Sequence, residues 1–166
     1  MWTDIISEFS DSPSQLRVVQ FLLENGFGVN ESGRVICNGL EIPATQVGRA
    51  AGVDRRVVDA TAHRILAIPF LRDVFTSMRA TPDLSRVAEK LGLSVITLLP
   101  TDARKKGIVG NAVRVLVEHD LGIRQIFVTD PQMSEDPKLV MIVEGPVPAQ
   151  LYEDLRALPD VRTLII

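Results

Sequence analysis

The sequence predicts an α+β protein with a helical N-terminal part that contains a β-hairpin, followed by a C-terminal part with the order βαββαβ. Two short helical runs meet at Gly52, and an Asn38-Gly39 pair stands between two β-prone runs. After Val95, short β-prone runs alternate with helical patterns to the end of the chain. Patterns of this kind in 166 residues indicate one domain or two small ones.

Residues 44–65, ATQVGRAAGVDRRVVDATAHRI, have the pattern of a helix-turn-helix. With Gly52 as the ninth position of the motif, the fifth is Gly48, which is small enough for the second helix to cross close by. The spacing therefore predicts two helices joined by a tight turn, with four apolar packing positions at Val47, Ala51, Val53 and Val58.

The second of these helices is expected to begin after Asp54, whose carboxylate can accept bonds from free backbone amides. Arg55 and Arg56 then stand in its first turn, the end of a recognition helix that contacts base edges and phosphates. Arg49 and Arg64 suit phosphate contacts, which position a protein on DNA without reading its sequence. The predicted DNA-binding residues are Arg49, Arg55, Arg56 and Arg64.

A first helix is expected from Ser12-Pro13 to Gly26, because serine suits a cap, proline suits a first turn and Asn-Gly is a stop signal. The Asn38-Gly39 pair predicts a type I′ turn between strands at residues 34–37 and 40–42. This hairpin can act as a wing that touches the DNA backbone, or it can cover one edge of the helical core. The N-terminal domain is thus predicted to be a winged-type helix-turn-helix.

Residues 81–92 predict a connector helix that begins near Thr81-Pro82, with an apolar face formed by Leu84, Val87, Ala88 and Leu91. We place the N-terminal domain at residues 1–80 and the C-terminal domain, which includes the connector, at residues 81–166.

The rest of the chain predicts four strands and two helices. The strands are expected at residues 95–99, 123–129, 139–143 and 161–166, and the helices at residues 107–119 and 148–158. The order βαββαβ is that of the ferredoxin-like arrangement, an antiparallel sheet with both helices on one face.

Composition limits the classes of function. Hydrophobic residues make up 46% and charged residues 23% of the chain, which favours a packed core over disorder. The net charge of −3 argues against a general nucleic-acid coat, so any DNA contact has to come from a local basic patch. Residues 49–64 provide one, with four arginines and His63 against Asp54 and Asp59.

The sequence predicts no metal site and no cofactor, because one cysteine and two distant histidines give no spacing typical of metal ligands. The N-terminus has no signal-peptide pattern, and no apolar run approaches the roughly 20 residues of a membrane span. We therefore expect a cytoplasmic protein without a membrane partner.

The loop at residues 101–107, TDARKKG, places three consecutive cations before a glycine that opens a helix. The free amides and dipole of such a helix favour an anion, and Gly107 lets a ligand approach the backbone closely. The same run also suits a solvated loop without a ligand.

These residues resemble those of ACT domains, small regulatory modules that bind amino acids. The resemblance lies in LLPTDARKKG, the helix IVGNAVRVLVEHD and the step LGIRQI into the second strand. The whole chain also resembles archaeal proteins described as predicted regulators of amino-acid metabolism, in which a helix-turn-helix precedes an ACT domain.

The resemblance implies a ligand held between two ACT domains, and therefore a homodimer or a higher homo-oligomer. By position, the expected ligand contacts of one subunit are Asp102, Arg104, Lys106, Gly107, Ile108 and Val109, and those of its neighbour are Ile123, Arg124 and Gln125. Arg124 stands where an amide side chain is common, and the cationic loop favours an anionic metabolite beside an amino acid as the effector.

Together these features predict a ligand-responsive transcriptional regulator that is not an enzyme, with DNA and a small metabolite as partners. One alternative is a metabolite sensor that regulates a partner enzyme without binding DNA. A weaker alternative is an acylphosphatase-like enzyme, for which Gly107, Gly110 and Arg114 would form the phosphate loop; Arg114, however, falls about two turns into the helix.

Overall fold

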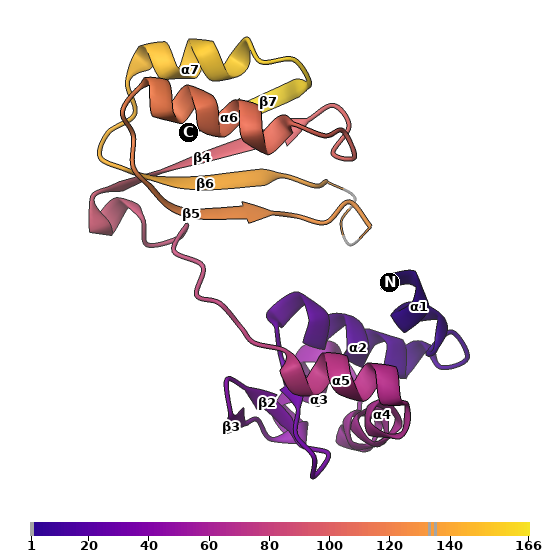
Figure 1. The fold of residues 1–166 in the computed structure, drawn as a ribbon. Coiled ribbons are helices and arrows are strands. Elements are labelled where there is room, and N and C mark those ends of the chain that lie inside the picture. The colour runs from indigo at the N-terminus through magenta and orange to yellow at the C-terminus, as the bar shows by residue number, and fades with distance from the viewer. Residues whose placement is uncertain (1, 133, 135) are drawn as a thin grey trace. The chain divides into compact units, whose positions relative to one another are not determined.

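The computed structural model describes residues 2–132, 134 and 136–166, and it is an α+β protein with two antiparallel sheets (Figure 1). The chain divides into two compact units between Pro82 and Asp83. Each unit has its own buried apolar cluster, and each is described separately below. None of the described helices is long and apolar enough to cross a membrane.

The N-terminal unit contains five helices and a small sheet in its described residues. The helices are α1 (Trp2–Ser7), α2 (Pro13–Asn25), α3 (Ala44–Ala51), α4 (Arg55–Ala67) and α5 (Pro69–Ser77), and the strands are β1 (Gly28–Val29), β2 (Val35–Cys37) and β3 (Leu40–Glu41). The expected bounds of α2 are confirmed: it begins at Pro13 and ends before Gly26, which has a φ of 65°. Ser12 occupies the cap position, but its side chain makes no capping bond.

Helices α3 and α4 meet at the turn that the sequence predicts. Gly52 ends α3 with a φ of 66°, and the Asp54 carboxylate accepts a bond from the Arg56 amide at 2.8 Å to begin α4. A Cβ atom on Gly48 would lie 2.7 Å from the Val53 carbonyl oxygen, so only glycine permits this close approach. Val47 and Val58 are both 1% exposed, which places the facing sides of the two helices in the core.

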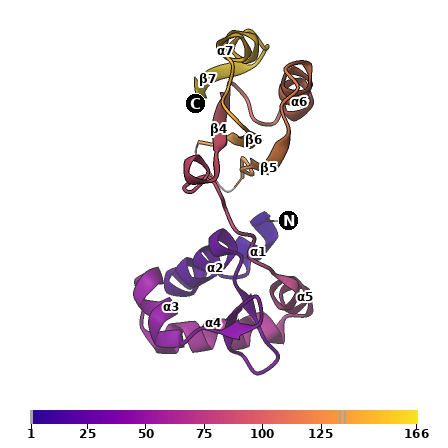
Figure 2. The same cartoon turned by 90° about the vertical axis from the view of Figure 1, so that its left-hand side faces the viewer.

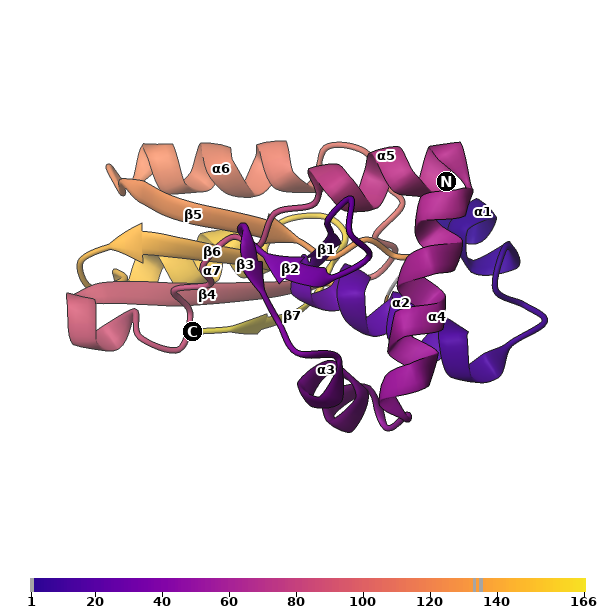
Figure 3. The same cartoon turned by 90° about the horizontal axis from the view of Figure 1, so that it is seen from below.

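The predicted hairpin is present, but it belongs to a three-stranded sheet with the order β1-β2-β3. Asn38 and Gly39 have φ values of 50° and 89°, as the turn requires. The Asn38 side chain also exchanges two hydrogen bonds with the backbone of Ala80, at 3.0 and 3.1 Å. The sheet precedes α3 in the chain, and its strand β1 packs on α4 and α5 (Figure 3).

The connector helix expected over residues 81–92 is wrong. The segment contains turns and one 3-10 turn, Glu89–Leu91. Of the expected apolar face only Ala88 is fully buried, whereas Val87 and Leu91 are 40% and 57% exposed. A helix this short is marginal without a buried face, and Asp83 instead accepts a bond from the nearby Ser85 amide.

The C-terminal unit has the order βαββαβ. Its elements are β4 (Leu93–Pro100), α6 (Ile108–Glu118), β5 (Ile123–Val128), β6 (Leu139–Glu144), α7 (Ala149–Arg156) and β7 (Val161–Ile165). The four strands form one antiparallel sheet with the order β5-β6-β4-β7, so β5 and β7 are its edges.

Both helices of this unit lie on the same face of the sheet (Figure 2). Their inward residues, such as Leu116 and Leu151, share one apolar cluster with alternate residues of β4 and β6, such as Ile96 and Met141. Alternation with period two on the strands therefore fixes which face of the sheet is covered. The position of α6 above the sheet in turn places the loop before it at the end of β4.

The close approach at Gly48 gives a first prediction. Replacing Gly48 with alanine should lower the free energy of unfolding of the N-terminal unit by about 1–3 kcal/mol, because the added methyl overpacks a backbone contact. Trp2, the only tryptophan, packs against the N-terminal core, so its fluorescence in a urea titration measures this unit. As a control, Gly110→Ala in α6, where nothing lies within 4 Å of the added Cβ, should leave the Trp2 transition unchanged. Equal stability of G48A and the wild type would contradict the prediction.

Candidate functional site

Three of the four predicted DNA-binding arginines are exposed and near the turn between α3 and α4. Arg49 is in the last turn of α3, and Arg55 and Arg56 are the first residues of α4. Their side chains make no hydrogen bond or ion pair with other described residues. These three guanidinium groups are therefore available to an external partner.

Arg64 is placed differently. Its guanidinium donates to Asp11 Oδ1 at 3.0 Å, to Gln15 Oε1 at 2.9 Å and to the Glu8 carbonyl oxygen, and it lies 5.0 Å from the centre of the Phe9 ring. The side chain is 29% exposed. Arg64 thus joins α4 to the segment between α1 and α2, and the structure does not group it with the other three arginines.

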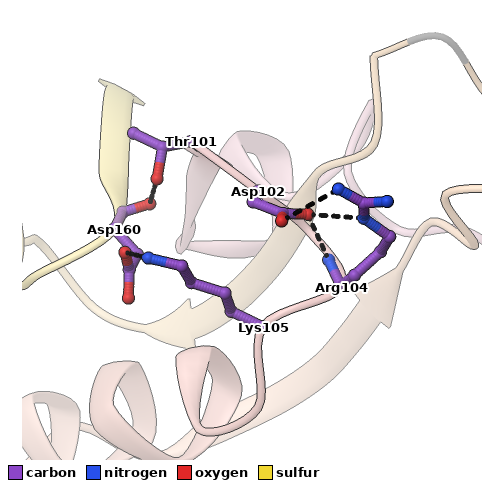
Figure 4. A network of polar contacts seen from close by, with 5 residues as sticks. All are labelled: Thr101, Asp102, Arg104, Lys105 and Asp160. Atoms are coloured by element: carbon purple, nitrogen blue, oxygen red, sulfur yellow. Dashed lines mark hydrogen bonds and ion pairs between the residues drawn. The ribbon is translucent and has the colours of Figure 1, made fainter.

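In the C-terminal unit, two ion pairs hold the loop at residues 101–107, one within the loop and one to Asp160 (Figure 4). The Asp102 carboxylate accepts three bonds from Arg104, from its backbone amide and from Nε at 3.0 Å and from Nη2 at 3.1 Å. These bonds hold the pKa of Asp102 below its usual value. Asp102 is therefore committed to Arg104 rather than open to a ligand's ammonium group.

Lys105 is also paired within the chain. Its Nζ bonds to the Asp160 carboxylate, which raises the pKa of Lys105, and the Thr101 amide donates to the Asp160 carbonyl oxygen at 2.8 Å. Of the three consecutive cations, Lys106 has no hydrogen bond or ion pair in the part of the chain that the structure describes. The loop is thus much less cationic toward a ligand than its sequence indicates.

A cavity of about 130 Å³ lies beside the beginning of α6. Three predicted ligand residues, Gly107, Ile108 and Val109, line it, and Gly107 has a φ of 94°. Lining residues that the sequence analysis missed include Val128, Thr129 and Lys138. They come from the end of β5 and the beginning of β6, which hydrogen-bond to each other at Thr129 and Lys138. Strand pairing alone brings them to α6, so no local sequence signal marks them.

Asp102 and Arg104 line a different hollow, larger and more polar, of about 430 Å³. Its other charged residues are Asp136 and Arg162, which form an ion pair of 2.7 Å. Of the residues predicted from the first subunit, three line the apolar cavity, Asp102 and Arg104 line this second hollow, and Lys106 lines neither.

The second predicted set, residues 123–125, lies at the opposite end of β5 from the cavity beside Gly107. Ile123 is half-buried, Arg124 forms an ion pair of 2.7 Å with Glu144, and Gln125 Oε1 accepts a bond of 3.0 Å from the Leu84 amide. Ile123 and Val128 are five residue steps apart along the strand, a distance of roughly 17 Å. A single chain therefore does not bring the two predicted sets together.

The described residues contain no group of three or more histidine, cysteine, aspartate or glutamate side chains that could hold a metal ion. Arg114 is exposed on α6, two turns from Gly107, so it does not complete a phosphate loop around that glycine. No known family model matches the chain, and no curated protein is similar to it.

The bonds to Asp102 give a second prediction. Its folded pKa is depressed, so its contribution to stability is complete above the unfolded pKa of about 4 and is lost as the pH falls through the folded value. Asp102→Asn should therefore show a smaller fall in melting temperature below about pH 4 than the wild type. Calorimetry measures the melting temperature of the C-terminal unit, which contains Asp102, as the transition that is not accompanied by a change in Trp2 fluorescence. As a control, Asp120→Asn, at an exposed aspartate without an ion pair among the described residues, should have the same pH dependence as the wild type. Identical pH profiles for all three proteins would contradict a contribution of Asp102 to stability.

Proposed function

We propose that this protein is a DNA-binding transcriptional regulator that senses a small metabolite through an ACT-like C-terminal unit. The observation that carries the proposal is the turn between α3 and α4, which presents three arginines without a side-chain partner among the described residues, Arg49 at the end of α3 and Arg55 and Arg56 at the beginning of α4. A helix-turn-helix contacts base edges with this end of its second helix. The N-terminal unit supplies the DNA-binding surface, with Arg55 and Arg56 at the bases and Arg49 on a phosphate.

The C-terminal unit supplies the sensor in this proposal. Its ferredoxin-like arrangement and the glycine that opens α6 are those expected of an ACT domain. The cavity beside Gly107 is lined mainly by apolar side chains, among them Pro100, Ile108 and Leu139. A carboxylate can bind the free amides of α6, while about 130 Å³ suits a small apolar side chain. Arg104 and Lys105 are neutralised within the chain, and Lys138 is the cation of the cavity lining without an ion pair among the described residues, so an amino acid with a single carboxylate fits better than a dicarboxylate.

A second copy of the chain completes the site. Val109, Val113 and Val117 follow one another at helical spacing on α6, and Val117 is 66% exposed. Edge strand β5 ends at Val128, which is 61% exposed. Exposed apolar side chains of this kind on a helix beside a free strand edge favour pairing of two copies.

Antiparallel pairing of β5 with β5 of the second copy also accounts for the distance between the two predicted sets of ligand residues within one chain. In such a pair the beginning of one strand lies beside the end of the other. Residues 123–125 of one copy then approach Val128 of the other, next to its cavity. The two predicted sets meet only in the dimer, so the ligand stabilises the dimer and biases its geometry.

Regulation in this mechanism is a linkage between two sites. A metabolite bound between the C-terminal units favours one arrangement of the dimer, and that arrangement sets the spacing of the two α4 helices on DNA. The effect is limited to the difference in the ligand's affinity for the two arrangements.

A third prediction tests the DNA-binding surface. Arg55→Ala should weaken binding to a duplex selected by the wild-type protein from a random library by about 1–3 kcal/mol, through loss of a base contact. Fluorescence anisotropy over a series of salt concentrations measures it, and the wild-type affinity should fall steeply with salt. Arg156→Ala, at an exposed arginine in α7, serves as the control. A wild-type protein without salt-dependent DNA binding would favour the alternative of a sensor that acts on a partner enzyme.

A fourth prediction tests the shared sensor site. Val117→Asp should convert the dimer to a monomer in light scattering, because it places a charge at an exposed residue of the apolar stripe. In a thermal-shift screen of the twenty amino acids, a ligand at 100 times its dissociation constant adds about 2.7 kcal/mol to wild-type stability, and V117D should lose that shift. Ala149→Asp, which adds the same charge at an exposed position of α7, should keep both the dimer and the shift. A V117D protein that remains dimeric would exclude this interface.

A further inference from the structure

The turn between β1 and β2, residues 30–34, contacts α4 about one to two helical turns after its beginning. Gly33 has a φ of 73°, and a Cβ atom there would be 3.5 Å from the His63 ring. One residue further, Arg34 Nη1 is 3.9 Å from Asp59 Oδ1. Both partners belong to α4, so the turn contacts this helix over a full helical turn.

The turn is held in one conformation by its own hydrogen bonds. Asn30 Oδ1 accepts from the amides of Ser32 and Arg34 at 3.1 and 2.9 Å, and the backbones of Asn30 and Arg34 also bond at 2.9 Å. The Asn30 amide group donates to Glu41 on β3 at 3.0 Å. A side chain on such a turn is presented to a partner with little further loss of conformational entropy.

Arg34 adds positive charge where α4 carries its single acidic residue. Asp59 is the only carboxylate within α4, and it would repel a nearby phosphate. The pair is weak, because its oxygen and nitrogen are 3.9 Å apart and the side chains are 61% and 41% exposed. Arg34 therefore offsets the charge of Asp59 and still retains donors that face solvent.

Position along the helix favours a phosphate as the external partner of Arg34. Asp59 is four residues after Arg55, about 6 Å along the axis of α4. Each DNA strand carries one phosphate charge per 3.4 Å of helix axis. Since Arg34 is 3.9 Å from Asp59, its guanidinium is suited to a phosphate near the bases that Arg55 contacts in the proposed function.

The other turn of the sheet is less suited to this role. Asn38, at the Asn38-Gly39 turn, is bonded on both sides of its amide to the backbone of Ala80. That turn holds the chain segment that leaves the unit, whereas the turn at residues 30–34 holds α4. The turn at residues 30–34 is therefore better suited to the role of a wing than the Asn38-Gly39 turn, for which that role was one of two possibilities.

We propose that residues 30–34 form a second DNA-contact element, in which Arg34 binds a backbone phosphate beside the groove that α4 enters. This inference rests on the proposed DNA-binding function. It adds a contact that carries affinity without sequence preference, because phosphates are the same at every base pair.

The experiment measures binding of the full chain to a labelled random-sequence duplex at several salt concentrations. In a plot of log K against the logarithm of the salt concentration, the slope for Arg34→Ala should be smaller in magnitude than that of the wild type by about 0.9. The affinity advantage of the wild type over R34A should therefore be roughly eightfold larger at 0.1 M salt than at 1 M salt. Arg34→Lys keeps the charge and should restore most of the slope. Arg79→Ala, whose guanidinium bonds only to the nearby Met78 and Thr76 carbonyls, should bind as the wild type does.

Asp59→Asn separates a direct phosphate contact from simple neutralisation of Asp59. Asp59→Asn alone should tighten binding, and Arg34→Ala should still cause the same roughly eightfold loss in the Asp59→Asn background. Disappearance of that loss in the double variant would overturn the inference, as would an unchanged slope for R34A. Those results leave DNA binding by the wild type intact, whereas a wild type that binds no DNA overturns the proposed function itself. Unchanged Trp2 fluorescence shows that each variant is folded.

Discussion

The close backbone contact at Gly48 is the constraint on which the N-terminal unit depends. Because the Gly48 position tolerates no Cβ next to the Val53 carbonyl, α3 and α4 can cross at short distance and bury Val47 against Val58. The direction of α4 then determines where Arg55 and Arg56 point and which face the turn at residues 30–34 contacts. Arg64, at the other end of α4, secures that direction by bonding to the segment before α2.

The two units differ in how far their cationic side chains are paired within the chain. In the N-terminal unit Arg49, Arg55 and Arg56 have no partner among the described residues, so their charge is available to an anion. In the loop before α6, Arg104 and Lys105 are paired with Asp102 and Asp160, and most of the charge is used within the chain. In the proposed regulator, this difference matches a polyanion to the first unit and a small ligand with one carboxylate to the second.

Local signals in the sequence predicted much of the fold. Gly26, Gly52 and the Asn38-Gly39 pair fix turns through backbone conformations that few residues adopt, and short β-prone runs predicted the strands of the C-terminal unit. Helix α1 was missed although Ile5 and Phe9 are spaced for one helical face. The pairing of Lys105 with Asp160 and the placement of Arg64 and Lys138 join residues far apart in sequence, so only the folded chain defines them. For the connector, helical spacing was present but a buried face was not.

The connection between the units bears on how a ligand signal could travel. Ala80 is bonded to Asn38 in the N-terminal unit, and the Leu84 amide is bonded to Gln125 in the C-terminal unit. Four residue steps of extended chain span at most about 14 Å, so only a short segment lies between these two bonds. In the proposed regulator Gln125 is also a ligand residue. A ligand that takes the Gln125 amide oxygen competes with the Leu84 amide for it. In the proposed mechanism, ligand binding at Gln125 therefore alters the hydrogen bonding of the segment that joins the two units.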